Sequence, residues 1–214
     1  MRKHVSILFI LCVGILSSAC GILFPPAYKS GDVILVDDFS SPNFQWDVWK
    51  SIDQSTVAYY QEGLVFVINS PNTDYVSVLN YVYSNSRSEV FAANLNGMMN
   101  NGFGLVCRYQ DDENYYAFLV SSDGYYGIIR VLYGGFTVLN SGKMQYSDLI
   151  RQGEAVNYIR ADCVGNQLTL YVNSNQLAQV EDDVFSEGLV GLMASSFEEP
   201  GVAVLFDNFL LINP

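Results

Sequence analysis

The chain has 214 residues, of which 22 are Asp or Glu, 10 are Lys or Arg and one is His. Half of the residues are hydrophobic and 14% are aromatic, so the chain is too apolar to remain disordered at its formal charge of −12. Its few and scattered basic residues exclude nucleic acid as an expected partner, because phosphate binding depends on Lys and Arg. The length suits one all-β sandwich domain.

The first twenty residues have the pattern of an export signal. A basic start at residues 1–4 is followed by an apolar run at 5–16, which is too short to span a bilayer, and then by small residues ending at Cys20. Residues 17–20 resemble the lipobox of bacterial lipoproteins, in which the cysteine is acylated and becomes the new N-terminus. Ser17 departs from that pattern, which most often has Leu there. We expect an exported lipoprotein, anchored through Cys20 on the extracytoplasmic side of a membrane; the alternative is an ordinary signal peptide.

Cleavage of residues 1–19 would change which chemistry is available. It removes Arg2, Lys3 and His4, so the exported chain becomes more acidic and has no histidine. Nucleophile systems that use histidine and metal sites built on imidazole are thereby excluded. We expect residues 20–32, which include adjacent prolines, to form the lipid anchor and a short tether. We expect residues 33–214 to form the folded domain.

The number of cysteines fits export to an oxidising compartment. Cys12 leaves with the signal and Cys20 takes the lipid, which leaves Cys107 and Cys163 as a pair in an oxidising environment. We predict a disulfide between them, and two buried free thiols are the alternative.

From residue 33 onward, β-branched and aromatic runs alternate with Gly, Asn, Asp and Ser clusters at about the eight-to-twelve-residue spacing of a β-sandwich. The clearest hairpin joins two alternating runs across Gly165 and Asn166, a pair suited to a tight turn. The only helical turn predicted covers residues 146–152. The predicted strands are 33–39, 64–69, 75–83, 88–95, 103–109, 115–121, 126–132, 137–140, 155–163, 167–172, 176–180, 188–194 and 202–212.

Several fragments, in this order, resemble concanavalin A-like lectin and glucanase domains, and within them the laminin-G-like and sugar-hydrolase-like jelly rolls. The fragments are FGLVCRYQDDENYYAF at 103–118, SDGYY at 122–126, RADCVGNQLTLYVN at 160–173, GLVGL at 188–192 and FDNF at 206–209. The resemblance covers residues 33–213 and departs at 174–175, where the family often has Asn-Gly. It implies two stacked antiparallel sheets forming a jelly-roll sandwich, with a concave face used for carbohydrate or protein recognition.

Acidic clusters suggest two further functions. Domains of this family often bind calcium where the first and last strands meet, which implicates Asp37, Asp38 and Asp207; a structural role for Asp207 is the alternative. A sugar-active hydrolase could use Asp112 and Glu113 with the help of a metal. The carboxylate signature of the family's glucanases is missing, however, and we expect a non-catalytic protein.

The aromatic content points to ligand binding, because pyranose rings stack on aromatic side chains while polar groups hold the hydroxyls. Trp46 and Trp49 either flank a groove or plug the end of the sandwich. We expect the protein to bind carbohydrate or another surface polymer, and a structural or adhesive module with a protein partner is a third possibility. The predicted ligand-binding residues lie on consecutive strands and are Arg108, Gln110, Asn114, Tyr116, Tyr126 and Arg130.

Overall fold

The computed structural model describes residues 28–214. The predicted signal, the lipidation site Cys20 and most of the tether lie outside this range. In the described range, no helix has the length and apolarity needed to cross a membrane.

Two antiparallel sheets make up the protein. The nine-stranded sheet contains, in spatial order, β14 (Asn175–Glu181), β13 (Gln167–Val172), β12 (Asn157–Val164), β6 (Ser86–Asn96), β16 (Val202–Ile212), β4 (Gly63–Ile68), β3 (Thr56–Tyr60) and β2 (Trp49–Lys50), with β1 (Val33–Asp37) also paired to β16. The seven-stranded sheet contains β10 (Gly135–Val138), β9 (Tyr125–Leu132), β8 (Asn114–Val120), β7 (Asn101–Asp111), β15 (Leu189–Ser196) and β5 (Thr73–Val78), with β11 (Gln145–Tyr146) paired to β9.

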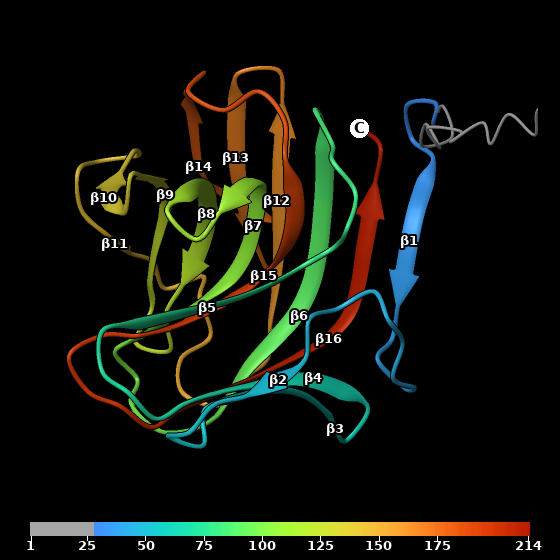
Figure 1. The fold of residues 1–214 in the computed structure, drawn as a ribbon. Helices are drawn as coiled ribbons and strands as arrows, with labels where there is room; N and C mark the ends of the chain where they lie inside the picture. Colours follow the sequence, from blue (N-terminus) through green and yellow to red (C-terminus); the bar gives the residue numbers. More distant parts are fainter. Residues whose placement is uncertain (1–27) are drawn as a thin grey trace, which may run out of the picture.

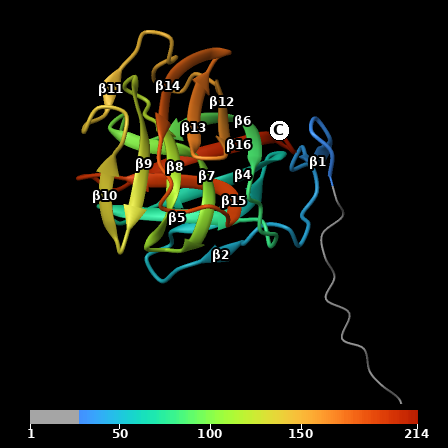
Figure 2. The ribbon, with the colours of Figure 1, turned by 90° about the horizontal axis from the view of Figure 1, so that it is seen from above.

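The sheets form two layers. The seven-stranded sheet lies in front in Figure 1, and the view from above separates it from β6, β12, β13 and β14 behind it (Figure 2). The predicted all-β antiparallel sandwich is therefore confirmed. The helical turn predicted at 146–152 is wrong, because the end of β11 and a turn occupy that region. The strands β2 and β3 are absent from the sequence prediction.

Alternation along the strands builds the core. Ile159, Ala161 and Cys163 of β12 are buried between the sheets, and the predicted hairpin forms with Val164 opposite Gln167. Each of these strands turns one face inward because side chains alternate across a sheet. The core between the sheets is rich in phenylalanine, with Phe66 and Phe206 in edge-to-face contact at 5.2 Å between ring centroids.

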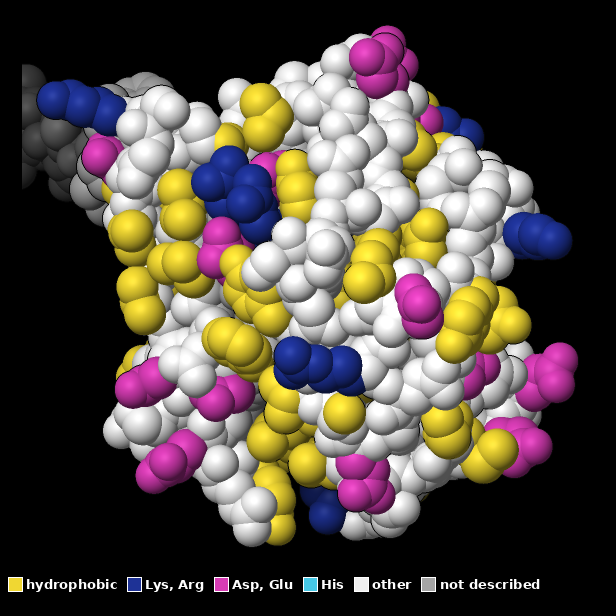
Figure 3. Space-filling model, turned by 180° about the vertical axis from the view of Figure 1, so that it is seen from behind, with side chains coloured by type: hydrophobic (Ala, Val, Ile, Leu, Met, Phe, Trp, Pro, Cys, Tyr) yellow, Lys and Arg dark blue, Asp and Glu magenta, His cyan; other side chains and the backbone are white. Residues whose placement is uncertain are grey.

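The outer face of the nine-stranded sheet is mostly polar at its centre. Arg87 of β6 pairs with Asp162 of β12 at 3.2 Å, and Arg160 also contacts this carboxylate while its guanidinium lies over the ring of Tyr171. Figure 3 shows this face, on which basic and acidic side chains lie close together among hydrophobic ones.

The outer face of the seven-stranded sheet, by contrast, carries a second apolar cluster. Val106, Ala117 and Met193 are fully buried there, and Val138 and Met144 from the β10–β11 region pack against the cluster. This sheet therefore buries apolar side chains on both faces.

Cys107 and Cys163 form the predicted disulfide, which joins β7 of one sheet to β12 of the other with 6.8 Å between the Cα atoms. Both residues are buried in the core. The bond closes a loop of 56 positions and thus restricts the unfolded chain.

We predict that the double substitution Cys107→Ala and Cys163→Ala lowers the free energy of unfolding by up to about 4 kcal/mol, because loop-closure entropy returns to the unfolded state. Urea denaturation of the variant and of the oxidised parent measures this. An unchanged midpoint, together with free thiols in the parent by mass spectrometry, would contradict the disulfide.

Candidate functional site

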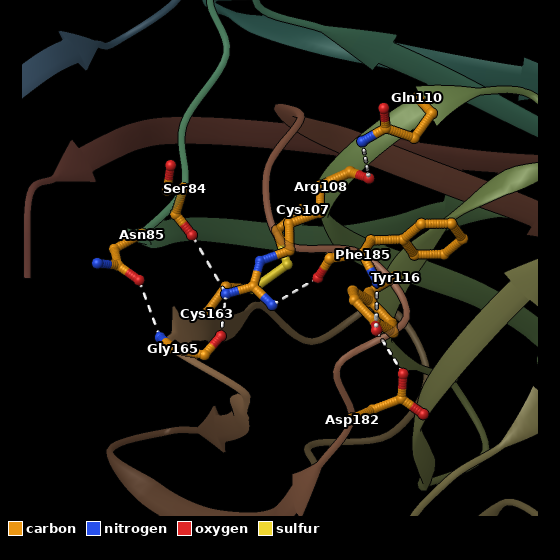
Figure 4. The surroundings of a disulfide bond; sticks show 10 residues. All are labelled: Ser84, Asn85, Cys107, Arg108, Gln110, Tyr116, Cys163, Gly165, Asp182 and Phe185. Carbon is orange, nitrogen blue, oxygen red and sulfur yellow. Dashed lines mark hydrogen bonds between the residues drawn. A yellow bond between two sulfur atoms is a disulfide. The ribbon is translucent and has the colours of Figure 1, made fainter.

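Four of the six predicted ligand-binding residues contact the connection between β14 and β15. Arg108 is buried, and its guanidinium donates hydrogen bonds to the carbonyl oxygens of Phe185 at 2.8 Å, Ser84 at 3.2 Å and Gly165. The Gln110 side chain donates to the carbonyl oxygen of Glu187. Figure 4 shows Arg108 next to the disulfide, with its head group among these segments.

Tyr116 and Arg130 hold the same connection through Asp182. The Tyr116 hydroxyl donates to the Asp182 carboxylate and accepts from the backbone N–H of Phe185 at 3.1 Å. Arg130 forms an ion pair with Asp182 at 2.6 Å. Burial, with a contribution from the bond to Asp182, raises the pKa of Tyr116 to about 12, so its hydroxyl stays protonated at neutral pH.

The other two residues have local partners. Asn114 donates to Asp111 at 2.8 Å within the β7–β8 turn, and the Tyr126 hydroxyl donates to Gln145 of β11 at 3.2 Å. None of the six lines either of the two pockets described below. Arg108 and Tyr116 are buried, so these two side chains do not lie on an open surface, and ligand binding by the six residues stays a prediction of the sequence.

A bulge explains why the sequence pattern misplaced Arg108. Arg108 has a φ of 50°, and the pairing of β7 with β8 shifts register between Cys107 and Asp111. Strict alternation would place Arg108 on the face opposite Cys107, but at the bulge both side chains reach the other sheet: Cys107 bonds to Cys163, and Arg108 donates to the carbonyl oxygen of Gly165 after β12.

The predicted calcium ligands lie near the pairing of the first and last strands. β1 pairs with β16, with Asp37 opposite Phe209 and Asp207 two residues further along. The carboxylate of Asp37 already accepts hydrogen bonds from the backbone N–H of Phe39, the side-chain amide of Asn43 and the Trp46 indole at 2.7–2.9 Å. Asp38 is exposed, and hydrogen bonds from Ser40 lower its pKa.

The carboxylate oxygens of Asp37 are already engaged by these hydrogen-bond donors. This arrangement does not suit a hard cation, because such a cation needs free oxygen ligands. Residues 28–214 contain no group of three or more His, Cys, Asp or Glu side chains that could hold a metal ion. Calcium binding stays a prediction of the sequence alone. Trp46 is buried in the core, with 4.9 Å between its ring centroid and that of Phe209, and it lines neither of the two pockets described below.

A pocket of about 340 Å³ lies where the edge strand β5 approaches the β7–β8 turn. We call it the face pocket. Trp49 and Tyr75 meet edge to face at 4.4 Å between ring centroids, and Tyr115 of β8 adds a third ring. The lining residues are Trp49, Asp74, Tyr75, Val76, Asp112 and Tyr115.

Two carboxylates give the face pocket its polar character. Burial raises the pKa of Asp74 above its usual value. Asp112 is exposed and accepts a hydrogen bond from the Tyr109 hydroxyl at 2.5 Å. Burial, followed by the charge of Asp74, raises the pKa of Tyr115 well above its usual value, so its phenol stays neutral. No Lys or Arg lines this pocket.

Part of this pocket could be anticipated from the sequence. The sequence predicts Trp49 as a possible flank of a groove and Asp112 as a possible catalytic acid. Asp74 and Tyr75 were missed, because only the pairing of β5 with β15 shows that they belong to the sheet edge beside the β7–β8 turn.

Comparison with known proteins supports the fold alone. No family model and no curated protein matches the sequence. Carbohydrate-binding module CBM66 from Bacillus subtilis is similar in structure, with a TM-score of 0.63 and 18% identity over 78% of this chain and 95% of that one. A protein of unknown function with a galectin-like fold, also from Bacillus subtilis, has a TM-score of 0.63 and 10% identity over 87% and 98%. A beta-glucanase from Bacillus licheniformis has a TM-score of 0.61 and 10% identity over 87% and 100%.

For Asp37 we predict a structural role. Asp37→Ala should lower the free energy of unfolding by about 1–3 kcal/mol, because the buried Trp46 indole and Asn43 amide lose their acceptor. The melting midpoint of the parent should be the same in calcium and in chelator. A midpoint raised by calcium in the parent, and no longer in the variant, would instead establish the predicted cation site.

Arg108 provides the second test of a structural role. Arg108→Leu should lower the free energy of unfolding by about 3 kcal/mol or more, because three carbonyl groups lose a charged donor. Arg151→Leu, at an exposed position, is the matched control and should be close to neutral. A stable Arg108→Leu variant that loses glycan affinity would support the ligand-binding role and contradict the structural one.

Proposed function

We propose that this protein binds carbohydrate without chemical turnover, and that the face pocket holds the sugar. The supporting observation is that two partly exposed rings, Trp49 and Tyr75, line one pocket together with two carboxylates, beside the buried Tyr115. Aromatic rings stack on the apolar face of a pyranose, and carboxylates accept hydrogen bonds from its hydroxyls. The expected lipid anchor at Cys20 would display this pocket at a membrane surface.

The charge of the pocket narrows the class of sugar. Asp74 and Asp112 face the ligand and no basic side chain lines the pocket, so a uronic acid or sulfated sugar would bring like charges together in a partly desolvated space. Uncharged glycans avoid this cost. We therefore propose neutral glycans as the ligands.

Binding fits better than hydrolysis by the predicted acid pair. Asp112 lines the pocket, whereas Glu113 is exposed in the β7–β8 turn and is not among the lining residues. Two carboxyl groups must flank one glycosidic bond to cleave it. Asp112 and Glu113 do not share the pocket in that way.

We predict that residues 28–214 bind neutral glycans on an array and ignore polyanionic ones. Trp49→Ala should weaken the best hit by about tenfold or more in calorimetry, because it removes a stacking ring that lines the pocket. Asp74→Asn should weaken it as well, while Asp148→Asn, at an exposed position away from the pocket, should not.

Two outcomes would contradict the proposal. If glycan affinity is unchanged in Trp49→Ala and in Asp74→Asn, the face pocket is not the binding site. If the protein releases reducing ends from the bound glycan, it is an enzyme. Capture of a cell-envelope protein without competition by sugar, and with no glycan bound, would favour the adhesive alternative.

A further inference from the structure

A second pocket, of about 380 Å³, lies beside β1 at the end of β5. We call it the edge groove. Its lining combines aromatic rings, aliphatic side chains and two side-chain amides, and it contains no charged residue. The lining residues are Tyr28, Ile34, Leu35, Phe44, Gln45, Leu79, Asn80, Tyr81 and Tyr83.

The chemistry of the edge groove suits an uncharged ligand rich in hydroxyl groups. Phe44 is fully exposed and Tyr81 is 62% exposed, so both rings are free to stack. Burial, followed by the nearby phenols of Tyr28 and Tyr81, raises the pKa of Tyr83 to about 12. The Tyr83 phenol therefore stays neutral and can donate as well as accept, as can the amides of Gln45 and Asn80.

The same two chain segments form both pockets. The segment at 44–49 gives Phe44 and Gln45 to the edge groove and Trp49 to the face pocket. The segment at 74–83 gives residues 74–76 to the face pocket, and residues 79–81 and Tyr83 to the edge groove. Between the pockets, the Ser77 hydroxyl donates to the carbonyl oxygen of Asp47 at 3.1 Å and fixes one segment on the other.

β5 ends at Val78, and the chain between the pockets is buried at Ser77, Val78 and Leu79. Beyond β5, the N–H of Leu79 donates to Val190 at 2.9 Å, and Tyr83 and Gly188 exchange backbone hydrogen bonds, so the chain stays paired with the line of β15. At the rise of an extended strand, the five steps from Tyr75 to Asn80 cover at most roughly 17 Å. This length suits an extended oligosaccharide and exceeds a single sugar ring.

We infer that the face pocket and the edge groove are two subsites of one extended binding site for a neutral oligosaccharide chain. This inference rests on the proposed function and adds that the ligand is an internal stretch of polymer rather than a terminal sugar. Each subsite alone binds weakly. A chain long enough to occupy both gains affinity, because the second contact becomes intramolecular.

Calorimetry with di-, tetra- and hexasaccharides of the cello-, xylo- and fructo- series tests this on residues 28–214. The hexasaccharide of a series that binds should bind at least about tenfold more tightly than its disaccharide. Tyr81→Ala should reduce hexasaccharide affinity to near that of the shorter chains and leave binding at the face pocket intact. Tyr60→Ala, which removes a comparably exposed tyrosine outside both pockets, is the control and should change neither.

The outcomes separate the two proposals. The extended site is overturned if affinity does not depend on chain length and if Trp49→Ala loses affinity while Tyr81→Ala does not. The proposed function would then still stand. No binding by any series overturns both. If affinity rises with chain length in the parent, and this rise is absent in Tyr81→Ala, both proposals are supported.

Discussion

The arrangement of the sandwich depends on one buried cation. Arg108 lies beside the disulfide in β7 and binds carbonyl groups from three segments: the one before β6, the turn after β12 and the connection from β14 to β15. Holding Phe185 fixes the chain shortly before β15 begins. β15 in turn pairs with β5 and with the stretch that follows it, which line both pockets. The pockets therefore depend on a contact that touches neither of them.

The distribution of charge follows from how the two sheets are buried. The seven-stranded sheet buries an apolar cluster on each face, and the carboxylates of Asp74 and Asp112 lie at the β5 edge and in the β7–β8 turn. A carboxylate there is partly desolvated, which explains the raised pKa of Asp74. The same edge exposes aromatic rings because no further strand covers it. Stacking surfaces and acceptors thus meet at the edge for reasons of packing, and this combination suits a neutral sugar.

Much of the fold could be predicted from the sequence, and little of the site could. Alternation in residues 157–164 and the turn at Gly165 define a hairpin locally, and the count of available cysteines predicts the bond between Cys107 and Cys163. The role of Arg108 could not be read in this way, because a bulge breaks the alternation on which the prediction relied. Asp74 and Tyr75 join the pocket through pairing with β15, more than a hundred residues away in the sequence. Long-range pairing of this kind leaves no local pattern.

The two tryptophans allow the central claim to be tested in one spectrum. The indole N–H of Trp46 is buried and donates to Asp37, while Trp49 lines the face pocket. In an NMR titration of residues 28–214 with a neutral oligosaccharide, the indole signal of Trp49 should shift in a saturable way and that of Trp46 should stay in place. Saturable binding that leaves the Trp49 signal unmoved would contradict the assignment of the face pocket as the carbohydrate site.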